Sequence, residues 1–251
     1  MKLSIIIPAR NEEKSIVITV NDIIKSLSSE NIDHEILVVN DGSTDGTEEV
    51  LKQLVKIYPS LCYVNNTGQH GFGLAIRKGL ECFQGDALAI IMADGSDSPS
   101  DIIQYYRKLE EGYECVFGSR FIAGSRIHDY PPHKLILNRI ANLFIKVLFR
   151  LKLNDTTNAF KCYRREVING IQPILSHHFN LTVELPLKSI IRGYSYAIIP
   201  ITWTNRTHGL SKFNVKEMGS RYLFIVLFLF LEKLLSKGDY FRKDQKQYES
   251  K

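Results

Sequence analysis

Two carboxylates, Asp94 and Asp97, follow an unbroken apolar run at residues 87–92, in the segment ALAIIMADGSDSP. An apolar run bounded by Gly, Ser and Pro is typical of a strand buried on both faces. Ligands bind beyond the carboxyl ends of strands in open α/β sheets, and paired carboxylates suit a divalent cation that also binds substrate phosphates. The alternative is that Asp97 or Ser98 only caps a helix that begins near Pro99.

Polar residues follow two other predicted strands. Residues 35–40 (EILVVN) lead into DGSTDG, and residues 3–8 lead into PARNEE. Asp41 is a candidate acceptor of hydrogen bonds from a ribose or a base, whereas Asp45 is expected to cap the next helix. Three neighbouring polar strand ends favour a nucleotide pocket over three unrelated helix caps.

Alternating strands and helices must bring these turns together. Strands are predicted at 3–8, 35–40, 61–64, 87–92 and 114–117, and helices at 13–28, 46–58, 71–83 and 100–111. This order is typical of repeated βαβ units and a largely parallel sheet. After Gly118 we predict a loop to 132, a helix at 133–150, a short strand at 159–163 and a helix at 181–192. A strand at 196–203 alternates enough to lie at the antiparallel edge of the sheet.

Size and composition favour one large α/β domain. The chain has 251 residues, of which 44% are hydrophobic, and this is enough for a full core. The formal net charge of +5 arises after Arg120, which indicates anionic ligands or a membrane surface. No dense basic stripe with interleaved aromatic residues is present, so nucleic acid is not an expected partner. The four scattered cysteines suggest neither a zinc site nor disulfides, and a reduced, cytosolic compartment fits them. The apolar run at 3–8 is too short for a signal peptide.

Residues 222–231, YLFIVLFLFL, are apolar on every face. Ten residues fall short of the roughly 20 that a membrane-spanning helix needs. We expect a helix that lies in the membrane interface, where basic flanking residues attract anionic lipids. The alternative is a helix packed on the domain or in a dimer. The basic residues are Lys212, Lys216, Arg221, Lys233, Lys237, Arg242 and Lys243.

The amino-acid sequences of these motifs and their order along the chain resemble those of the family-two inverting glycosyltransferases. IIPARNEE, VVNDGSTDGT and NTGQHGFGLAIRKG look like the donor-binding half of that family. GSRF, NDTTNAFKCYRREV and PITWTNRTHGLSKF resemble its dolichol-phosphate or polyprenyl-phosphate mannose synthase branch. The resemblance implies a GT-A (Rossmann-like) domain over 1–213, with a donor-binding half at 1–118 and an acceptor-binding half at 119–213. An apolar helix and basic tail, expected to be membrane-associated, follow at 214–251.

The resemblance also implies an activity. A sugar, expected to be mannose from GDP-mannose, would be transferred to a polyprenyl or dolichyl phosphate with inversion, assisted by Mg²⁺ or Mn²⁺. Asp94 matches the carboxylate that ligates the metal in this family, but Met92 stands where the first aspartate of an Asp-x-Asp motif is usual. Asp97 therefore replaces a lost ligand, or the metal relies on Asp94, donor phosphates and water. The donor-binding residues that the resemblance implies are Pro8, Ala9, Asn11, Glu12, Asn40, Asp41, Ser43, Ala93, Asp94 and Gly95.

An acceptor phosphate is already anionic, so it has little need of a general base. It needs groups that neutralise its charge and orient it toward the sugar. The groups expected around the acceptor phosphate and the donor diphosphate are Arg120, Lys134, Asn138, Arg139, Arg206 and Lys212. Together with the metal, the cations would stabilise the leaving nucleoside diphosphate. Asp94, Arg120, Arg206 and Lys212 are expected to carry the catalysis.

Two other functions stay open. If the acceptor is a saccharide hydroxyl, Glu184 is the candidate general base; otherwise Glu184 is structural and is expected to hydrogen-bond the loop that carries Asp155. The absence of the first aspartate, at Met92, also allows a non-catalytic nucleotide-sugar-binding protein. The expected location is the cytoplasmic, inner face of a membrane, with a second copy or a membrane subunit as a further partner.

Overall fold

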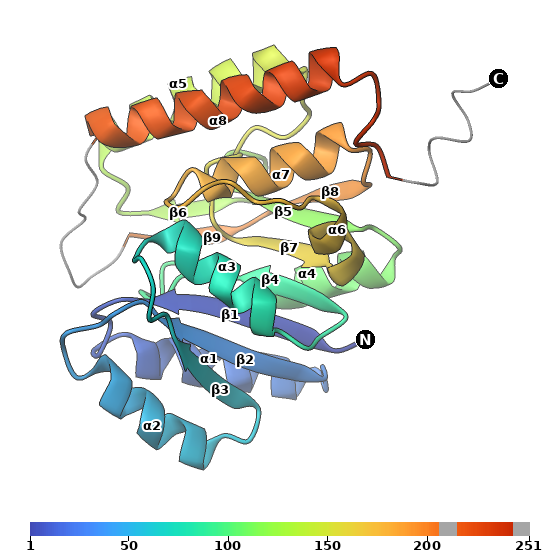
Figure 1. Cartoon of the computed structure of the whole chain (residues 1–251). Coiled ribbons are helices and arrows are strands. Elements are labelled where there is room, and N and C mark those ends of the chain that lie inside the picture. Colours follow the sequence, from blue (N-terminus) through green and yellow to red (C-terminus); the bar gives the residue numbers. More distant parts are fainter. Residues whose placement is uncertain (206–214, 243–251) are drawn as a thin grey trace.

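A seven-stranded sheet with helices on both faces forms the centre of the computed structural model, which describes residues 1–205 and 215–242 (Figure 1). The strands are β1 (Leu3–Ala9), β2 (His34–Asn40), β3 (Leu61–Asn65), β4 (Ala87–Ile90), β5 (Cys115–Ser119), β6 (Arg126–His128), β7 (Lys161–Arg164), β8 (Tyr196–Pro200) and β9 (Thr202–Thr204). The helices are α1 (Ile16–Ser29), α2 (Thr47–Ile57), α3 (Phe72–Cys82), α4 (Pro99–Glu110), α5 (Pro132–Phe149), α6 (Arg165–Gly170), α7 (Leu181–Ile191) and α8 (Val215–Leu235).

The sheet order is β3-β2-β1-β4-β7-β5-β8. β1 pairs in parallel with both β2 and β4, and all seven residues of β1 are buried. A strand covered on both faces needs apolar side chains at every position, which explains the unbroken apolar runs. The structure thus confirms the predicted α/β class and the mostly parallel central sheet.

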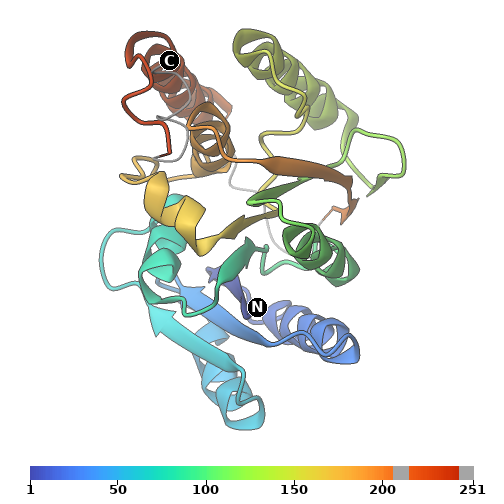
Figure 2. The same cartoon turned by 90° about the vertical axis from the view of Figure 1, so that its right-hand side faces the viewer.

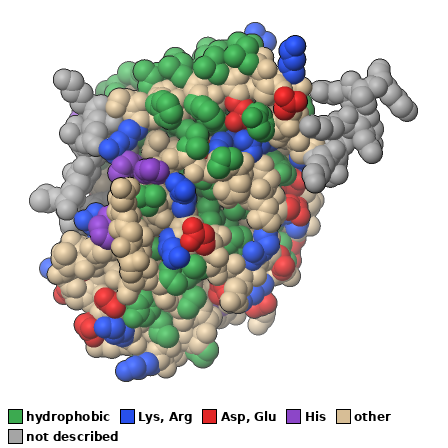
Figure 3. All heavy atoms as spheres, viewed as in Figure 1, with side chains coloured by type: hydrophobic (Ala, Val, Ile, Leu, Met, Phe, Trp, Pro, Cys, Tyr) green, Lys and Arg blue, Asp and Glu red, His purple; other side chains and the backbone are tan. Residues whose placement is uncertain are grey.

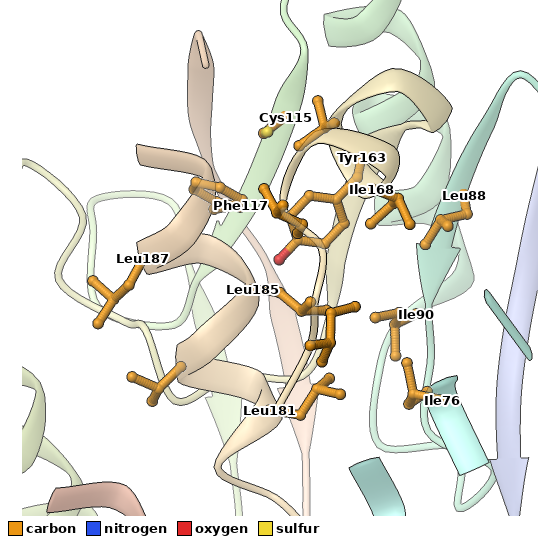
Figure 4. Close-up of a cluster of buried hydrophobic side chains, with 14 of the residues drawn as sticks. Ile76, Leu88, Ile90, Cys115, Phe117, Tyr163, Ile168, Leu181, Leu185 and Leu187 are labelled. Atoms are coloured by element: carbon orange, nitrogen blue, oxygen red, sulfur yellow. The ribbon is translucent and has the colours of Figure 1, made fainter. Parts of the chain in front are cut away.

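Two apolar clusters lie on opposite faces of the sheet because side chains alternate along each strand. Ile5 and Ile7 face a cluster that includes α1, α2 and α4, whereas Ile6 faces one that includes α3 and α5 to α8. Figure 4 shows the second cluster, in which side chains of α3, β4, β5, β7, α6 and α7 meet. This packing holds the carboxyl ends of the parallel strands in register.

The strand that runs antiparallel in the seven-stranded sheet is β7, whereas the sequence predicts an antiparallel strand at 196–203. β7 pairs antiparallel with β4 and with β5, inside the sheet. β8 lies at the edge as predicted, but it pairs with β5 in parallel. The prediction of an antiparallel edge at 196–203 was wrong. Alternation of apolar and polar residues indicates that one face of a strand is buried, but it does not indicate the direction of the strand. The same segment divides after Pro200, and β9 pairs with β6 in a separate two-stranded sheet.

α5 and α8 lie side by side on the outside of the molecule (Figures 1 and 2). The rings of Phe149 and Phe230 are 5.9 Å apart, and Lys233 Nζ donates a hydrogen bond of 2.9 Å to the Phe149 carbonyl. Residues 222–231, for which a helix is predicted, lie within α8. Within the described residues, no helix has both the length and the apolar character that crossing a bilayer requires.

Candidate functional site

The carboxyl ends of β1 and β2 are tied together by hydrogen bonds between the turns that follow them. Asp41 N donates to the Ala9 carbonyl at 2.8 Å. Asn11 Oδ1 accepts from Thr44 N at 2.7 Å, and Asn11 N donates to Ser43 Oγ at 3.1 Å. These strands are parallel neighbours, so the polar residues that follow them share one edge, as the sequence predicts.

Asp41 is buried, and its carboxylate is held by the loop that follows β3. Asn66 Nδ2 donates to Oδ1 at 2.7 Å, and Gly71 N donates to Oδ2 at 2.9 Å. The His70 ring lies 3.3 Å from Oδ1 and covers Gly42, where an added Cβ would come within 2.3 Å of the imidazole. The sequence places Asn66 and His70 in the motif NTGQHGFGLAIRKG of the donor-binding half, but neither is predicted individually as a site residue. Their position directly after a third parallel strand of the same sheet could have identified them as site residues.

Asn40 and Asp45 shape the turn between β2 and α2. Asn40 Nδ2 donates to Asn65 Oδ1 at 2.9 Å, and Asn40 Oδ1 accepts from Ser43 N at 3.2 Å. Asp45 Oδ1 accepts from the N–H of Thr47, the first residue of α2, at 3.0 Å. Asp45 thus accepts a hydrogen bond from the start of α2, but Gly46 and not Asp45 occupies the N-cap position, so Asp45 is not the N-cap that was predicted.

The acidic turn after β4 lies next to β1. Asp94 is half-buried, and its Oδ1 accepts from Ser96 N at 3.1 Å. Asp97 is only 4% exposed, and its Oδ2 accepts from Met92 N at 3.2 Å. Burial, together with the nearby charge of Asp94, raises the pKa of Asp97 to about 7. Ser98 is the N-cap of α4, which begins at Pro99 as that alternative predicts, but no side chain makes a capping hydrogen bond there, and the Asp97 carboxylate bonds to Met92 instead.

Strand β9 brings the second half of the chain against this acidic turn. Thr204 N donates to the Ser96 carbonyl at 3.0 Å, and Trp203 forms an isolated antiparallel bridge with Asp97. Residues 206–214 continue from this point, so Arg206 and Lys212, both predicted site residues, lie outside the described residues.

Arg120 is held in a buried ion pair. Its side chain is 7% exposed, and its Nε and Nη2 each donate to a different oxygen of Asp155 at 2.8 Å. Burial alone would raise the pKa of Asp155, but the Arg120 guanidinium holds it below its usual value. The guanidinium also lies 5.7 Å from the ring centroid of Tyr130 and 5.8 Å from that of Trp203. Arg120 was predicted as a free phosphate-binding cation, and its carboxylate partner was missed.

Lys161 closes the loop that carries Asp155. It is 1% exposed, and its Nζ donates to the carbonyls of Thr156 and Asn158. Burial lowers the pKa of Lys161 to about 7, although the charge of Asp155 opposes this shift. Lys161 therefore holds the loop from the interior of the protein, and its side chain contributes no charge to the surface.

The other predicted acceptor residues lie on α5. Lys134 and Arg139 are exposed, and the Arg139 guanidinium lies 4.7 Å from the centroid of the Phe121 ring. Asn138 Nδ2 donates to Thr157 Oγ1 at 2.9 Å, in the loop that carries Asp155. The two exposed cations are thus on the helix that contacts the loop carrying Asp155.

Glu184 is structural, but not in the way the sequence suggests. It is fully buried in α7, accepts from Leu175 N and Ser176 N at 2.8 and 2.7 Å, and pairs with Lys188 at 2.8 Å. The expected contact with the Asp155 loop was wrong, because the side chain points to the loop before its own helix. A carboxylate with these bonds has no exposed oxygen to act as a general base on a saccharide hydroxyl.

Asp94 and Asp97 are the carboxylates available to a cation at this edge. No cluster of three His, Cys, Asp or Glu side chains suitable for a metal occurs in the part of the chain that the structure describes. A cation would relieve the repulsion between Asp94 and Asp97 that contributes to the raised pKa of Asp97. A hard cation bound through one or two carboxylates takes its remaining ligands from water and phosphates. The residues present fit such an ion.

Comparisons with known proteins identify the family and the fold. Residues 4–171 match the sequence model described as "Glycosyl transferase family 2". Polyprenol monophosphomannose synthase from Mycolicibacterium smegmatis is 29% identical over 222 residues, which cover 85% of this chain and 82% of that protein. Dolichol-phosphate mannosyltransferase from Pyrococcus furiosus is 27% identical over 223 residues, which cover 87% of this chain but only 61% of that longer protein.

One solved structure extends the comparison of folds. Glucosyl-3-phosphoglycerate synthase from Mycobacterium tuberculosis, in complex with Mn²⁺, UDP-glucose and phosphoglyceric acid, superposes with a TM-score of 0.65 at 19% identity. The superposition covers 92% of this chain and 79% of that one. At this identity the likeness shows the fold alone, and it confirms the GT-A-like architecture.

Proposed function

The chain belongs to glycosyl transferase family 2 and is a glycosyltransferase, and from this premise we propose that it transfers mannose from GDP-mannose to a polyprenyl or dolichyl phosphate with inversion. The names of the two relatives support this donor sugar and this acceptor class. The observation that carries the choice of a lipid acceptor is an exposed apolar surface on α5 and α8, of which α5 contacts the loop that carries Asp155.

This surface, the α5–α8 face, consists of large apolar side chains on the two outer helices. Ile140 and Val147 on α5 are 60% and 68% exposed, and Phe224 on α8 is 62% exposed. Figure 3 shows apolar side chains gathered along this side of the molecule. The face comprises Ile136, Leu137, Ile140, Leu143, Phe144, Val147, Leu223, Phe224, Leu227, Phe228, Leu231, Leu234 and Leu235. Contiguous exposed apolar surface of this kind is typical of an interaction site.

The charges around the α5–α8 face fit anionic lipid headgroups. α5 contains no acidic residue and exposes Lys134 and Arg139. On α8, Glu232 is neutralised by Arg192, whose Nε lies 3.0 Å from its Oε1. An apolar face flanked by basic side chains suits the headgroup region of a bilayer. These features support the proposal that the enzyme acts at a membrane surface, for which we propose the cytoplasmic, inner face.

The proposed reaction needs no general base. A phosphate oxygen of the acceptor forms the new bond to the anomeric carbon, the bond from that carbon to the nucleoside diphosphate breaks, and its electron pair leaves with the diphosphate. Asp41, Asn11 and Ser43 would orient the nucleoside at the β1–β2 edge. Lys134 and Arg139 would neutralise the acceptor phosphate as it approaches along α5. Arg206 and Lys212 are proposed to assist from the segment that follows β9.

Asp94, with Asp97 as a second carboxylate, would hold Mg²⁺ or Mn²⁺. When bound, the ion would neutralise charge on the departing diphosphate.

The rival acceptor, a saccharide hydroxyl, has less support. It requires a general base, and Glu184 is fully buried and paired with Lys188. A non-catalytic nucleotide-sugar-binding protein would have the same donor edge but no turnover.

The test is to incubate the protein and membranes with labelled GDP-mannose, UDP-glucose or UDP-N-acetylglucosamine and to extract the lipids. We expect label from GDP-mannose in the lipid extract. Label only in water-soluble saccharide would support the hydroxyl acceptor. Donor binding without turnover across a panel of lipid phosphates would support the non-catalytic protein.

A further inference from the structure

Asn142 is a buried polar residue on α5 whose side chain is fully engaged with the loop at 154–158. It is 2% exposed. Its Oδ1 accepts from the N–H and the hydroxyl of Thr156 at 2.7 and 2.8 Å, and its Nδ2 donates to Thr157 Oγ1 at 2.9 Å and to Asn138 Oδ1 at 2.8 Å. A buried amide uses its donors and acceptors in this way because an unsatisfied one would be costly.

The same loop holds Arg120. Asp155 precedes Thr156 and accepts both guanidinium bonds of the ion pair. Arg120 Nη2 also lies 3.4 Å from Thr157 Oγ1, the atom that Asn142 contacts. Asn142 and Arg120 therefore both form hydrogen bonds with residues 155–157, and this short segment connects them.

The opposite side of α5 belongs to the α5–α8 face. Leu143, next to Asn142 in sequence, is 62% exposed. Among the described residues, the buried positions of α5 are Asn142, Ile145 and Phe149. The contacts of Ile145 and Phe149 are apolar and weakly directional, whereas hydrogen bonds restrict both distance and angle. Asn142, which bonds to both Thr156 and Thr157, thus sets how α5 is aligned with the loop, together with the single bond from Asn138 to Thr157.

We propose that Asn142 is a positioning residue that couples α5, the helix with the exposed apolar face, to the Arg120–Asp155 pair. A lipid phosphate that meets Lys134 and Arg139 on α5 is then held in one geometry relative to the Arg120–Asp155 pair. The inference rests on the proposed function for the identity of the acceptor, but the coupling itself can be measured without turnover.

The first experiment uses the fluorescence of Trp203, the single tryptophan, whose ring lies 5.8 Å from the Arg120 guanidinium. The full-length variants are Asn142→Leu, Asn142→Asp, which keeps the acceptor oxygen, and Ile145→Ala, a control on the same buried side of α5. We expect a shifted emission maximum in Asn142→Leu, a smaller shift in Asn142→Asp and none in Ile145→Ala. An unchanged spectrum in both Asn142 variants, or an equal shift in Ile145→Ala, would overturn the coupling.

The second experiment separates donor from acceptor kinetics, with GDP-mannose and a short-chain polyprenyl phosphate in detergent. We expect Asn142→Leu to raise the KM for the lipid phosphate about 10-fold and to leave the KM for GDP-mannose within about 2-fold. Ile145→Ala should change neither. Equal changes in both KM values would show that Asn142 has a merely structural role. If Asn142→Leu does not fold, the same comparison of KM values is made with Asn142→Asp. If the wild type shows no transfer while the Trp203 shift is present, the proposed function fails and the coupling stands.

Discussion

Asp94 is the half-buried carboxylate at the end of β4, and the proposed metal-assisted reaction depends on it most directly. Asp94→Asn keeps the shape but removes the charge that a hard cation requires. We expect kcat with Mn²⁺ to fall by about 100-fold or more, equivalent to roughly 3 kcal/mol of transition-state stabilisation. Asp22→Asn, at an exposed position of α1, is the matched control. Unchanged turnover in Asp94→Asn would remove the metal assignment.

Arg120 and Asp155 form a buried pair, so removing one partner leaves the other charge uncompensated. Arg120→Ala should lower the free energy of unfolding by about 3–5 kcal/mol, measured by urea denaturation. The double variant Arg120→Met with Asp155→Leu should recover much of this stability, because no buried charge remains. A loss below about 1 kcal/mol in the single variant would contradict the buried pair.

Asp97 makes stability depend on pH in the direction opposite to most carboxylates. Its pKa is raised from 3.8 to about 7, so between these values the folded protein keeps a proton that the unfolded chain releases. The free energy of unfolding should therefore fall as pH rises from about 4 to 7. Lys161, with a pKa lowered to about 7, acts in the opposite direction above that pH.

The measurement is urea denaturation at several pH values between 4 and 7 in the presence of a chelator. Asp97→Asn should flatten the decline relative to the wild type. Parallel curves for the two proteins would show that Asp97 titrates normally.

At the scale of elements, α5 and α8 expose apolar side chains that a membrane would cover. Burial of one large aliphatic side chain contributes about 1.5–3 kcal/mol, so Ile140→Glu should weaken binding to phosphatidylglycerol-containing vesicles by about 10-fold or more, measured by sedimentation. Ile57→Glu, on α2, is the control, because Ile57 is 63% exposed and Ile140 is 60% exposed. Equal losses in the two variants would argue against a specific α5–α8 face.

At the scale of the whole molecule, a donor nucleotide that binds the folded chain must stabilise it. With Mn²⁺ present, GDP at 100 times its dissociation constant should add about 2.7 kcal/mol to the free energy of unfolding. The corresponding rise in Tm should be larger for GDP than for UDP at equal concentration. A larger rise with UDP would contradict GDP-mannose as the donor.

The order of strands and helices in the first half, the polar edge after β1, β2 and β4, and the family could all be predicted from the amino-acid sequence. These features are local: an apolar run followed by polar turn residues defines a strand and its end without reference to distant residues. The hydrogen bond between Asp45 and Thr47 at the start of α2 is also local, because it joins residues only two positions apart.

Which polar groups face each other could not be predicted without the three-dimensional structure. Arg120 and Asp155 are 35 residues apart, and nothing in their local patterns distinguishes a buried ion pair from two separate charges. The antiparallel insertion of β7 and the burial of Glu184 likewise follow from how whole elements pack. The physical reason is that periodicity records whether a residue is buried, whereas its partner depends on the topology that brings distant segments together.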